Sequence, residues 1–450
     1  MYIMVEAMAN SVEDVLVDGL SFKLKPGASY INERKSVTFH PQGSNIYSTN
    51  GTKLIKILVS GDAWMDPSTF RVQYDLVNNG AAGLSLRPLG DPGSFFRRMR
   101  VLCNGQLVED IDNYNRVEAM FSCLSSSDSI ANIDAEGFGQ RWSRKSNYET
   151  AYTLDTYRGI LHGQSQTVLF KPLSGLLNQP KYLPLRYCPL TIELEIVSNN
   201  TDPIISDLTG ATFTNANTSV LWQIQNVQVK VDLCTLDNAL DNSYAEHLLS
   251  GKALPINYNT FVSQMQSILS GVNGQQKVRL NVTRALSRLK SVFVTLYKSM
   301  PATEKGTKEW NTFYSPMADY AGTNVNQFNA AGEFEAQLQL GAKLYPEYPI
   351  RSHAEAFYQL RKTLGVKSNN MHSFNIDSHE YRSTKFIWAT DMEKVLESGF
   401  SGQNTRAGDI LNIRFDHNDT NAGNYATSMH IILHSDQILE IRDGSVTVFD

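Results

Sequence analysis

Alternation of apolar and polar residues recurs along the chain, and it limits the possible folds more than any other feature. The clearest runs cover residues 70–76, 190–196, 227–233, 334–340 and 411–415. Because successive side chains of a strand point to opposite faces, each run predicts a strand with one buried and one solvated face. Such strands are typical of antiparallel sheets that pack face to face, as in β-sandwiches.

The alternation slips by one residue inside one of these segments. Trp222 and Ile224 share a phase, but the next apolar residue of the run is Val227, one position late. An extra residue in one strand of an antiparallel pair forms a β-bulge, so we expect a bulge near Asn226.

Three short segments carry helical signals. Residues 113–124 have apolar side chains at helical spacing, and residues 243–246 have the Ser-x-x-Glu pattern of a capping box. Residues 352–355 repeat this pattern, and Gly365 suits the position after a helix. Because helices this few and short cannot cover the sheets, strands must pack on strands, and the predicted fold class is all-β.

One stretch of the sequence is echoed 238–240 residues later. In each copy a phenylalanine opens a strand, a second strand follows, and a helix comes next. The matched pairs are Phe96 with Phe334, Ile111 with Ile350 and Leu124 with Leu364. An offset of about half the chain favours two similar domains in tandem, although two such stretches can also align by chance.

Four long polar segments separate the predicted strands and helices. They cover residues 124–165, 197–219, 299–332 and 366–383 and are rich in Ser, Thr, Asn, Gly and Tyr. Loops beyond about 12–15 residues are unusual unless they bind something or form an outward-facing surface. Their composition predicts ordered loops that pack on one another rather than disordered linkers.

The apolar runs are too short for a membrane helix, which needs about 20 residues. The longest covers residues 1–5, and acidic residues, Glu6 first, precede the first lysine, Lys23. We therefore expect neither a membrane span nor a secretory signal. With 40 Lys and Arg against 45 Asp and Glu, the net charge of −5 also argues against a protein that mainly coats duplex DNA.

The cysteines give no pattern of their own. Cys103, Cys123, Cys188 and Cys234 lie far apart, without CxxC or short His-partnered spacing. In the absence of a secretory signal, we expect all four to be free thiols that pack as small hydrophobic groups.

Motifs for catalysis, cofactors or metals are missing from the sequence. Neither GxxxxGK[ST] nor GxGxxG occurs. The nearest candidate for a zinc pair, His430 and His434, would be separated by about 13 Å on a strand. Residues 416–420 resemble the start of a calcium loop but lack its glycine and its final glutamate. We predict no catalytic, cofactor-binding or metal-binding residues and no enzymatic activity.

Residues 95–100 form a basic cluster that also contains two phenylalanines. On a regular strand Arg97 would share a face with Met99, and Arg98 would share the other face with Arg100. A protein interface or a solvated sheet face is the favoured interpretation, and nucleic-acid contact stays as the alternative.

Five stretches resemble a known family of proteins. Residues 170–177, 182–187 and 189–194 are similar to the first jelly roll of double jelly-roll major capsid proteins, in particular those of polinton-like viruses and virophages. Residues 101–111 and 438–448 are similar to the same group, which belongs to the capsid lineage of adenovirus and tailless phages. The segment 299–332 shows no such similarity.

The resemblance implies two tandem eight-stranded jelly-roll β-sandwiches with a few short helices and long loops. The expected domains are an N-terminal arm over residues 1–30, a first jelly roll over 31–236, a connector helix over 237–252 and a second jelly roll over 253–450. Residues 1–5 suggest an arm that packs under a neighbour or against an inner layer; an amphipathic membrane-surface helix is the rival, although it lacks an early basic residue.

The same resemblance implies a major capsid protein that forms pseudo-hexagonal trimeric capsomers of an icosahedral double-stranded DNA virus shell. The expected partners are two further copies in a homotrimer, neighbouring capsomers, penton and minor capsid proteins, and an inner membrane or genome layer beneath. No cofactor and no small-molecule substrate are expected. The protein would be made in the host cell and located in the virion capsid.

Two other functions stay open. The main alternative is a β-sandwich carbohydrate-binding or adhesin protein, in which tryptophans stack on sugars. Its candidate residues are Trp64, Trp142, Trp222, Trp310 and Trp388. A jelly-roll hydrolase is the other, but it requires clustered histidines or paired carboxylates on strands, and the sequence shows neither.

Overall fold

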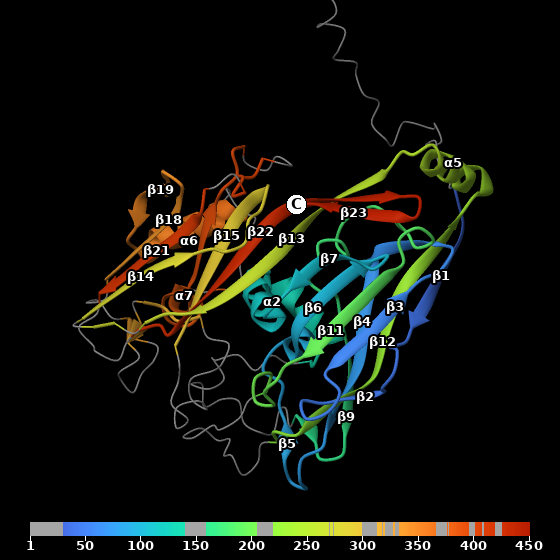
Figure 1. Ribbon diagram of the computed structural model, residues 1–450. Helices are drawn as coiled ribbons and strands as arrows, with labels where there is room; N and C mark the ends of the chain where they lie inside the picture. The colour runs from blue at the N-terminus through green and yellow to red at the C-terminus, as the bar shows by residue number, and fades with distance from the viewer. Residues whose placement is uncertain are drawn as a thin grey trace, which may run out of the picture.

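The computed structural model places two β-sandwiches side by side, the first from the N-terminal half of the chain and the second from the C-terminal half (Figure 1). The described residues are 30–139, 159–204, 219–269, 271–272, 274–298, 313–316, 318–319, 327–328, 333–365, 376, 378–395, 401–406, 409–418 and 425–450. Residues 1–29 of the predicted arm, Trp142 and Trp310 lie outside them, as does most of segment 299–332.

The first sandwich consists of two antiparallel sheets. One sheet has the order β1 (Ile31–Phe39), β12 (Trp222–Leu236), β4 (Trp64–Asn78) and β10 (Leu183–Pro184), with β2 (Ile46–Tyr47) on β12 and β9 (Ser165–Phe170) on β4. The other has the order β3 (Leu54–Val59), β11 (Leu190–Ile196), β6 (Phe96–Cys103) and β7 (Gln106–Ile111). A separate short pair joins β5 (Ser85–Leu86) to β8 (Ile160–Leu161).

The second sandwich repeats this arrangement. One sheet has the order β13 (Leu254–Ser267), β22 (Ser428–Arg442), β15 (Leu289–Tyr297) and β20 (Ile387–Asp391), with β23 (Ser445–Phe449) on β22. The other has the order β14 (Gln275–Asn281), β21 (Leu411–Asn418), β18 (Glu333–Leu340) and β19 (Lys343–Ile350). Two short strands, β16 (Ala318–Asp319) and β17 (Gln327–Phe328), pair with each other.

Both sandwiches have the strand order of a jelly roll. If the described main strands are numbered along the chain, and β9 and β10 are counted as one, the first, eighth, third and sixth form one sheet. The second, seventh, fourth and fifth form the other. This double-sheet, Greek-key order is the jelly roll. The predicted all-β class with two tandem eight-stranded jelly rolls is confirmed.

The predicted alternation appears directly in the burial of the strands. On β4, the side chains of Phe70, Val72, Tyr74 and Leu76 are 0% exposed, whereas the residues between them are partly exposed. Tyr74 packs edge-on against Phe96, with ring centroids 5.8 Å apart, and so connects the two sheets across the core. Burying a side chain of this size contributes about 1.5–3 kcal/mol, so one dry face per strand is enough to hold the sheets together.

Two of the three predicted helices are confirmed, and one begins elsewhere. Helix α2 (Tyr114–Cys123) and helix α6 (His353–Thr363) match their predicted segments, and the Ser352 hydroxyl accepts the Glu355 N–H as a capping box requires. The predicted start at Ser243 is wrong: α5 (Asn238–Leu249) begins after Asp237, whose carboxylate caps it through the Ala239 N–H.

The predicted long loops contain further structure. Helix α3 (Ser127–Glu136) and β8 fall in segment 124–165, β9 begins at its last residue, and α7 (Ser378–Ser383) falls in segment 366–383. A short 3-10 helix, η2 (Pro92–Phe95), precedes β6. Helix α3 was missed because its apolar positions are sparse. None of the described helices combines the length and hydropathy needed to cross a bilayer.

The internal echo has a structural counterpart. Strands β6 and β18, strands β7 and β19, and helices α2 and α6 occupy equivalent positions in the two sandwiches. Ile111 and Ile350 are the last residues of β7 and β19, and Leu124 and Leu364 are the C-caps of the two helices.

The bulge predicted near Asn226 is present. The pairing of β12 with β4 shifts between Gln225 and Gln228, and Asn226 has a positive φ of 51°. Asparagine tolerates this left-handed conformation better than most residues. Its side-chain amide donates to the Asp75 carboxylate at 2.7 Å, which fixes the bulge on the outer face of the sheet.

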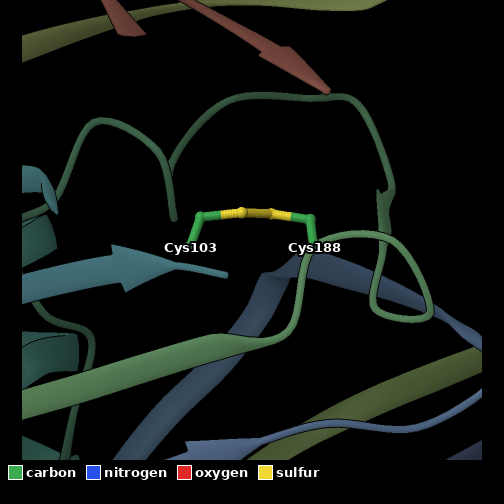
Figure 2. The surroundings of a disulfide bond; sticks show 2 residues. All are labelled: Cys103 and Cys188. Atoms are coloured by element: carbon green, nitrogen blue, oxygen red, sulfur yellow. A yellow bond between two sulfur atoms is a disulfide. The ribbon is translucent and has the colours of Figure 1, made fainter. Parts of the chain in front are cut away.

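The expectation of four free thiols is wrong for two of the cysteines. Cys103 and Cys188 form a disulfide (Figure 2). Cys123 and Cys234 are not disulfide-bonded. Cys103 ends β6 and pairs with Leu190 of β11, so the register of these strands brings Cys188 beside it, with the Cα atoms 5.4 Å apart. This proximity depends on strand pairing across 85 residues and has no local signal in the sequence.

Replacing both Cys103 and Cys188 by alanine should lower the free energy of unfolding by about 2–4 kcal/mol, because the bond restricts the unfolded chain across a long loop. Urea unfolding measures this loss, and Cys123→Ala, which removes a thiol outside this disulfide, is the matched control. Peptide mapping without reductant that recovered Cys103 and Cys188 as thiols would contradict the assignment.

Candidate functional site

His430 and His434, the nearest candidates for a zinc pair, pack against neighbouring aromatic rings. The His434 ring stacks on Phe261 with centroids 5.0 Å apart, and its Nδ1 lies 3.1 Å from the Ser291 hydroxyl. His430 is fully buried, and neither ring nitrogen has a hydrogen-bond partner. Among the described residues, no group of three or more His, Cys, Asp or Glu side chains is placed to hold a metal ion.

Burial keeps these rings neutral. Desolvation lowers the pKa of His434 to about 4, with a further contribution from the nearby Lys290 ammonium. It lowers the pKa of His430 to about 3, and there Arg116 adds to the effect. In the second sandwich His353, whose Nε2 lies 2.9 Å from the Ser315 hydroxyl, also has a pKa lowered to about 4 by burial.

The basic cluster at residues 95–100 is neutralised within the protein. Arg98 donates two hydrogen bonds to Asp110, at 2.6 and 2.7 Å, and Arg100 lies 3.1 Å from Glu193. Arg97 is exposed while Met99 is buried, so the predicted shared face is wrong. A bulge between β6 and β11 near Phe96 shifts the phase. Guanidinium groups already paired with carboxylates do not favour a nucleic-acid surface.

The calcium-like segment is likewise engaged in an ion pair. Arg279 on β14 holds Asp416 on β21 with two hydrogen bonds of 2.6 and 2.8 Å. Residues 419–424 lie outside the described residues. The bidentate contact leaves the Asp416 carboxylate engaged across the sheet.

The most extensive candidate site is the junction between the two sandwiches. Phe121 on α2 lies 4.6 Å from Phe261 of β13 and 5.4 Å from Phe293 of β15, measured between ring centroids. The Arg116 guanidinium lies 5.2 Å from the centroid of the Tyr297 ring on β15. Such aromatic and cation–π contacts each contribute about 0.5–1.5 kcal/mol. Helix α2 therefore joins the sandwiches.

Strand β7 adds a buried carboxylate to this junction. Glu109 is 2% exposed and accepts the backbone N–H groups of Gly175, at 2.9 Å, and Leu176, at 3.4 Å. The hydroxyls of Ser174 and of Thr260, on β13 of the second sandwich, also bond to it. Burial raises the pKa of Glu109, and the four donors oppose that rise. The carboxylate therefore ties three separate segments together.

The backbones of the two sandwiches also approach closely here. The Tyr258 hydroxyl of β13 lies 2.7 Å from Gln437 Oε1 and 3.3 Å from the carbonyl oxygen of Val108 on β7. Gly175 lies against the carbonyl of Asn259, where any Cβ would overlap it. A side chain at position 175 would force the sandwiches apart, so the junction requires glycine there.

The equivalent face of the second sandwich is open. We call Val108, Glu109, Arg116 and Phe121 the junction face of the first sandwich. Glu109 of β7 and Tyr348 of β19 occupy matched positions, two residues before the end of each strand. Glu109 is 2% exposed, whereas Tyr348 is 80% exposed. On α6, the counterpart of α2, Tyr358 is 64% exposed. Together with Leu344 of β19, these two tyrosines define the open face.

The strands that lie opposite these two faces also differ in exposure. On β13, which receives the junction face, Ile256, Tyr258 and Thr260 are buried. On β1, which holds the equivalent position in the first sandwich, residues 32–36 are all exposed. Each sandwich therefore has a surface equivalent to the junction face and a surface equivalent to β13. In the described residues, only the junction face of the first sandwich and the β13 surface of the second are in contact.

The tryptophans do not form a sugar-stacking surface in the described residues. Trp64, Trp222 and Trp388 are 8%, 4% and 1% exposed. The indole N–H of Trp222 donates to the Asn200 carbonyl at 2.9 Å, as expected for a tryptophan that packs in the interior. The alternative of a carbohydrate-binding protein receives no support from these three residues.

Glu109→Ala should lower the free energy of unfolding by about 3 kcal/mol, because it leaves several buried donors without an acceptor. Glu109→Gln, the matched control, keeps one acceptor and should cost less. Because the folded-state pKa of Glu109 is raised, its stabilising effect is full at low pH and falls as the pH rises through that pKa. Urea unfolding should therefore show the gap between wild type and Glu109→Gln narrowing from pH 4.5 to pH 8; a gap that widened would contradict this account.

The desolvation of His434 predicts acid destabilisation. Because the pKa of His434 is about 4 in the folded state, its contribution is present above the unfolded-state value and is lost as the pH falls from about 6.5 toward 4. The loss amounts to about 2–3 kcal/mol, and His434→Gln should make the fall in unfolding free energy shallower. His40→Gln, at an exposed site, is the control; equal slopes for both variants would count against the prediction.

Comparison with known proteins gives similarity in structure alone. No protein-family model and no curated protein matches the sequence. The PBCV-1 protein VP54, fitted into a reconstruction of the virophage Sputnik, superposes with a TM-score of 0.63 at 12% identity, over 95% of this chain and 99% of that one. The Faustovirus major capsid protein gives 0.57 at 9% identity, over 96% and 93% of the two chains.

A chain of the Sputnik virophage structure gives a TM-score of 0.56 at 11% identity, over 97% of this chain and 92% of that one. All three similarities extend over nearly the whole chain, so they cover both sandwiches together. At this level of identity they establish the fold, and the chain has the double jelly-roll architecture found in these viral proteins.

Proposed function

We propose that this chain is the major capsid protein of an icosahedral double-stranded DNA virus and that it acts by self-association rather than catalysis. The observation that carries the proposal is the pair of complete jelly rolls in one chain, matched end to end by the Faustovirus major capsid protein and by VP54 of PBCV-1. Three such chains provide six similar sandwiches, which can surround one axis as a pseudo-hexagonal trimer.

The contact between the two sandwiches supports one particular arrangement of the proposed trimer. In a pseudo-sixfold ring, the contact between the two sandwiches of one chain recurs between the second sandwich of that chain and the first sandwich of the next. The open face, with Leu344, Tyr348 and Tyr358, would then pack on the exposed side of β1 of the neighbouring copy. This head-to-tail contact closes after three copies, and a stable trimer requires interfaces of about 2,000 Å² or more.

The junction would determine whether the ring of sandwiches can close. Because Glu109, Phe121 and Gly175 fix the angle between the sandwiches of one chain, the next contact repeats at a set angle and the ring can close. A hinge at this position would allow open chains of subunits instead of closed trimers.

We also propose the domain boundaries, the assembly partners and the location that a capsid protein of this kind would have. The domains are the arm over residues 1–30, the jelly rolls over 31–236 and 253–450, and the connector helix over 237–252. Trimers would contact neighbouring capsomers, penton and minor capsid proteins, and the protein would reside in the virion. The arm would reach under a neighbour or toward an inner layer.

Light scattering after size exclusion should give about 150 kDa for a trimer of 50.3-kDa chains. Tyr348→Asp and Tyr358→Asp should each raise the concentration at which the trimer dissociates by about tenfold or more, because buried aromatic residues dominate interface energies. Since both side chains are largely exposed in the single chain, the circular dichroism spectrum and the unfolding midpoint of the monomer should not change.

Tyr358→Phe is the matched control for this experiment, because it keeps the ring and removes only the hydroxyl. It should preserve the trimer. A wild-type chain that stays monomeric at all concentrations would refute the proposed function, whereas trimers that tolerate both aspartates would refute only the location of the interface.

A further inference from the structure

An apolar groove lies where the chain passes from the first sandwich to the second. It has a volume of about 590 Å³ and lies between the start of β4, helix α5 and the start of β13. Its walls are formed mainly by Trp64, Tyr182, Leu240, Tyr244 and Leu254. In Figure 1, α5 stands at one end of the molecule, beside the strands β1 and β13.

Two polar groups at this groove are engaged within the protein, and most of the other residues that line it are apolar or aromatic. Trp64 Nε1 donates to the Asp241 carboxylate at 3.2 Å, and the Trp64 ring lies 4.8 Å from the ring of Tyr244. Lys181 on the rim donates to the Pro255 carbonyl at 3.0 Å. An apolar concavity of this kind on a surface marks a binding site for another apolar group.

The sequence that precedes β1 fits this groove. Tyr30, the first described residue, lines the groove itself, so the chain enters the described structure at the mouth of the groove. Ahead of it, Leu20, Phe22 and Leu24 alternate with polar residues, and Pro26-Gly27 supplies a turn signal. We propose that residues 20–24 fold back at this turn and dock in the groove of their own chain.

The tether length favours docking within one chain. Residues 25–29 span at most about 17 Å when extended, so they hold residues 20–24 within reach of the groove that Tyr30 lines. A segment tethered this closely experiences a local concentration in the millimolar range, which a segment from a second chain does not reach in dilute solution.

The charges agree with this direction of docking. If Leu20, Phe22 and Leu24 face the groove, Lys23 points away from it, on the other face of the extended segment. Asp237 caps helix α5, and the carboxylate of Asp241 on that helix lies at Trp64 of the groove, so carboxylates lie on this side of the groove. The docked segment would fix the start of the arm and leave residues 1–19 free, whether or not the chain forms a capsid.

Disulfide trapping tests this proposal. In the full-length chain with Cys123 and Cys234 replaced by alanine, Phe22→Cys together with Leu240→Cys should cross-link under mild oxidation. Ser21→Cys with Leu240→Cys is the matched control, because residue 21 lies on the opposite face of the segment. We expect at least about fivefold more cross-link for the first pair, and peptide mapping should place it within one chain.

Two outcomes of the trapping would overturn the proposal. Equal cross-linking from positions 21 and 22 would show that the segment has no preferred face in the groove. Cross-links found mainly between chains, recognised by mixing ¹⁵N-labelled with unlabelled protein, would assign the groove to the arm of a neighbouring copy.

Hydrogen exchange gives a second test that leaves the groove intact. The backbone amides of residues 20–24 should exchange about tenfold more slowly than expected for an unstructured peptide, and Phe22→Asp should abolish this protection. Because this variant alters none of the residues that line the groove, it should leave exchange in β1 and β4 unchanged. Exchange of these amides at the unstructured rate in the wild-type chain would overturn the proposal.

Discussion

The structure depends on the need of each alternating strand to bury one face. A strand with apolar residues on one side cannot be stable alone, and a sheet of such strands needs a second sheet to cover it. With only short helices available, the chain meets this need twice, and each time with the jelly-roll order. That order places the long strands β4 and β12, and likewise β15 and β22, at the centre of their sheets, where both edges are paired.

Features that depend on neighbouring residues could be predicted from the sequence, whereas features that depend on residues far apart in the chain could not. Alternation, capping at Ser352 and the bulge at Asn226 are local features, and each was predicted from neighbouring residues. The disulfide required the register of β6 against β11, which no short window contains. The start of α5 was predicted at the wrong residue because the capping-box pattern at Ser243 is a common one. The true N-cap, Asp237, directly follows the last residue of β12, so its position gave no separate helix signal.

Glu109 shows why the junction could not be read from the sequence. In a regular strand Leu107, Glu109 and Ile111 would share a face, so the glutamate would be a single charged residue within an otherwise apolar face. The structure exposes Leu107 at 43% and buries Glu109 at 2%, because a bulge between β6 and β7 changes the phase. The only signal was a charged residue at an apolar position, and its donors come from segments 65 or more residues away.

The two sandwiches share a topology but not a surface chemistry, and the proposed trimer offers a physical reason for the difference. The junction within one chain forms as the chain folds, so its buried Glu109 meets donors that are always present. A contact between separate chains forms from hydrated surfaces, and burying a carboxylate there would cost the loss of its hydration at every association. Exposed tyrosines avoid this problem, since their rings bury well while their hydroxyls remain hydrated in the free subunit. The replacement of Glu109 by Tyr348 at the matched position is therefore what assembly from soluble subunits would require.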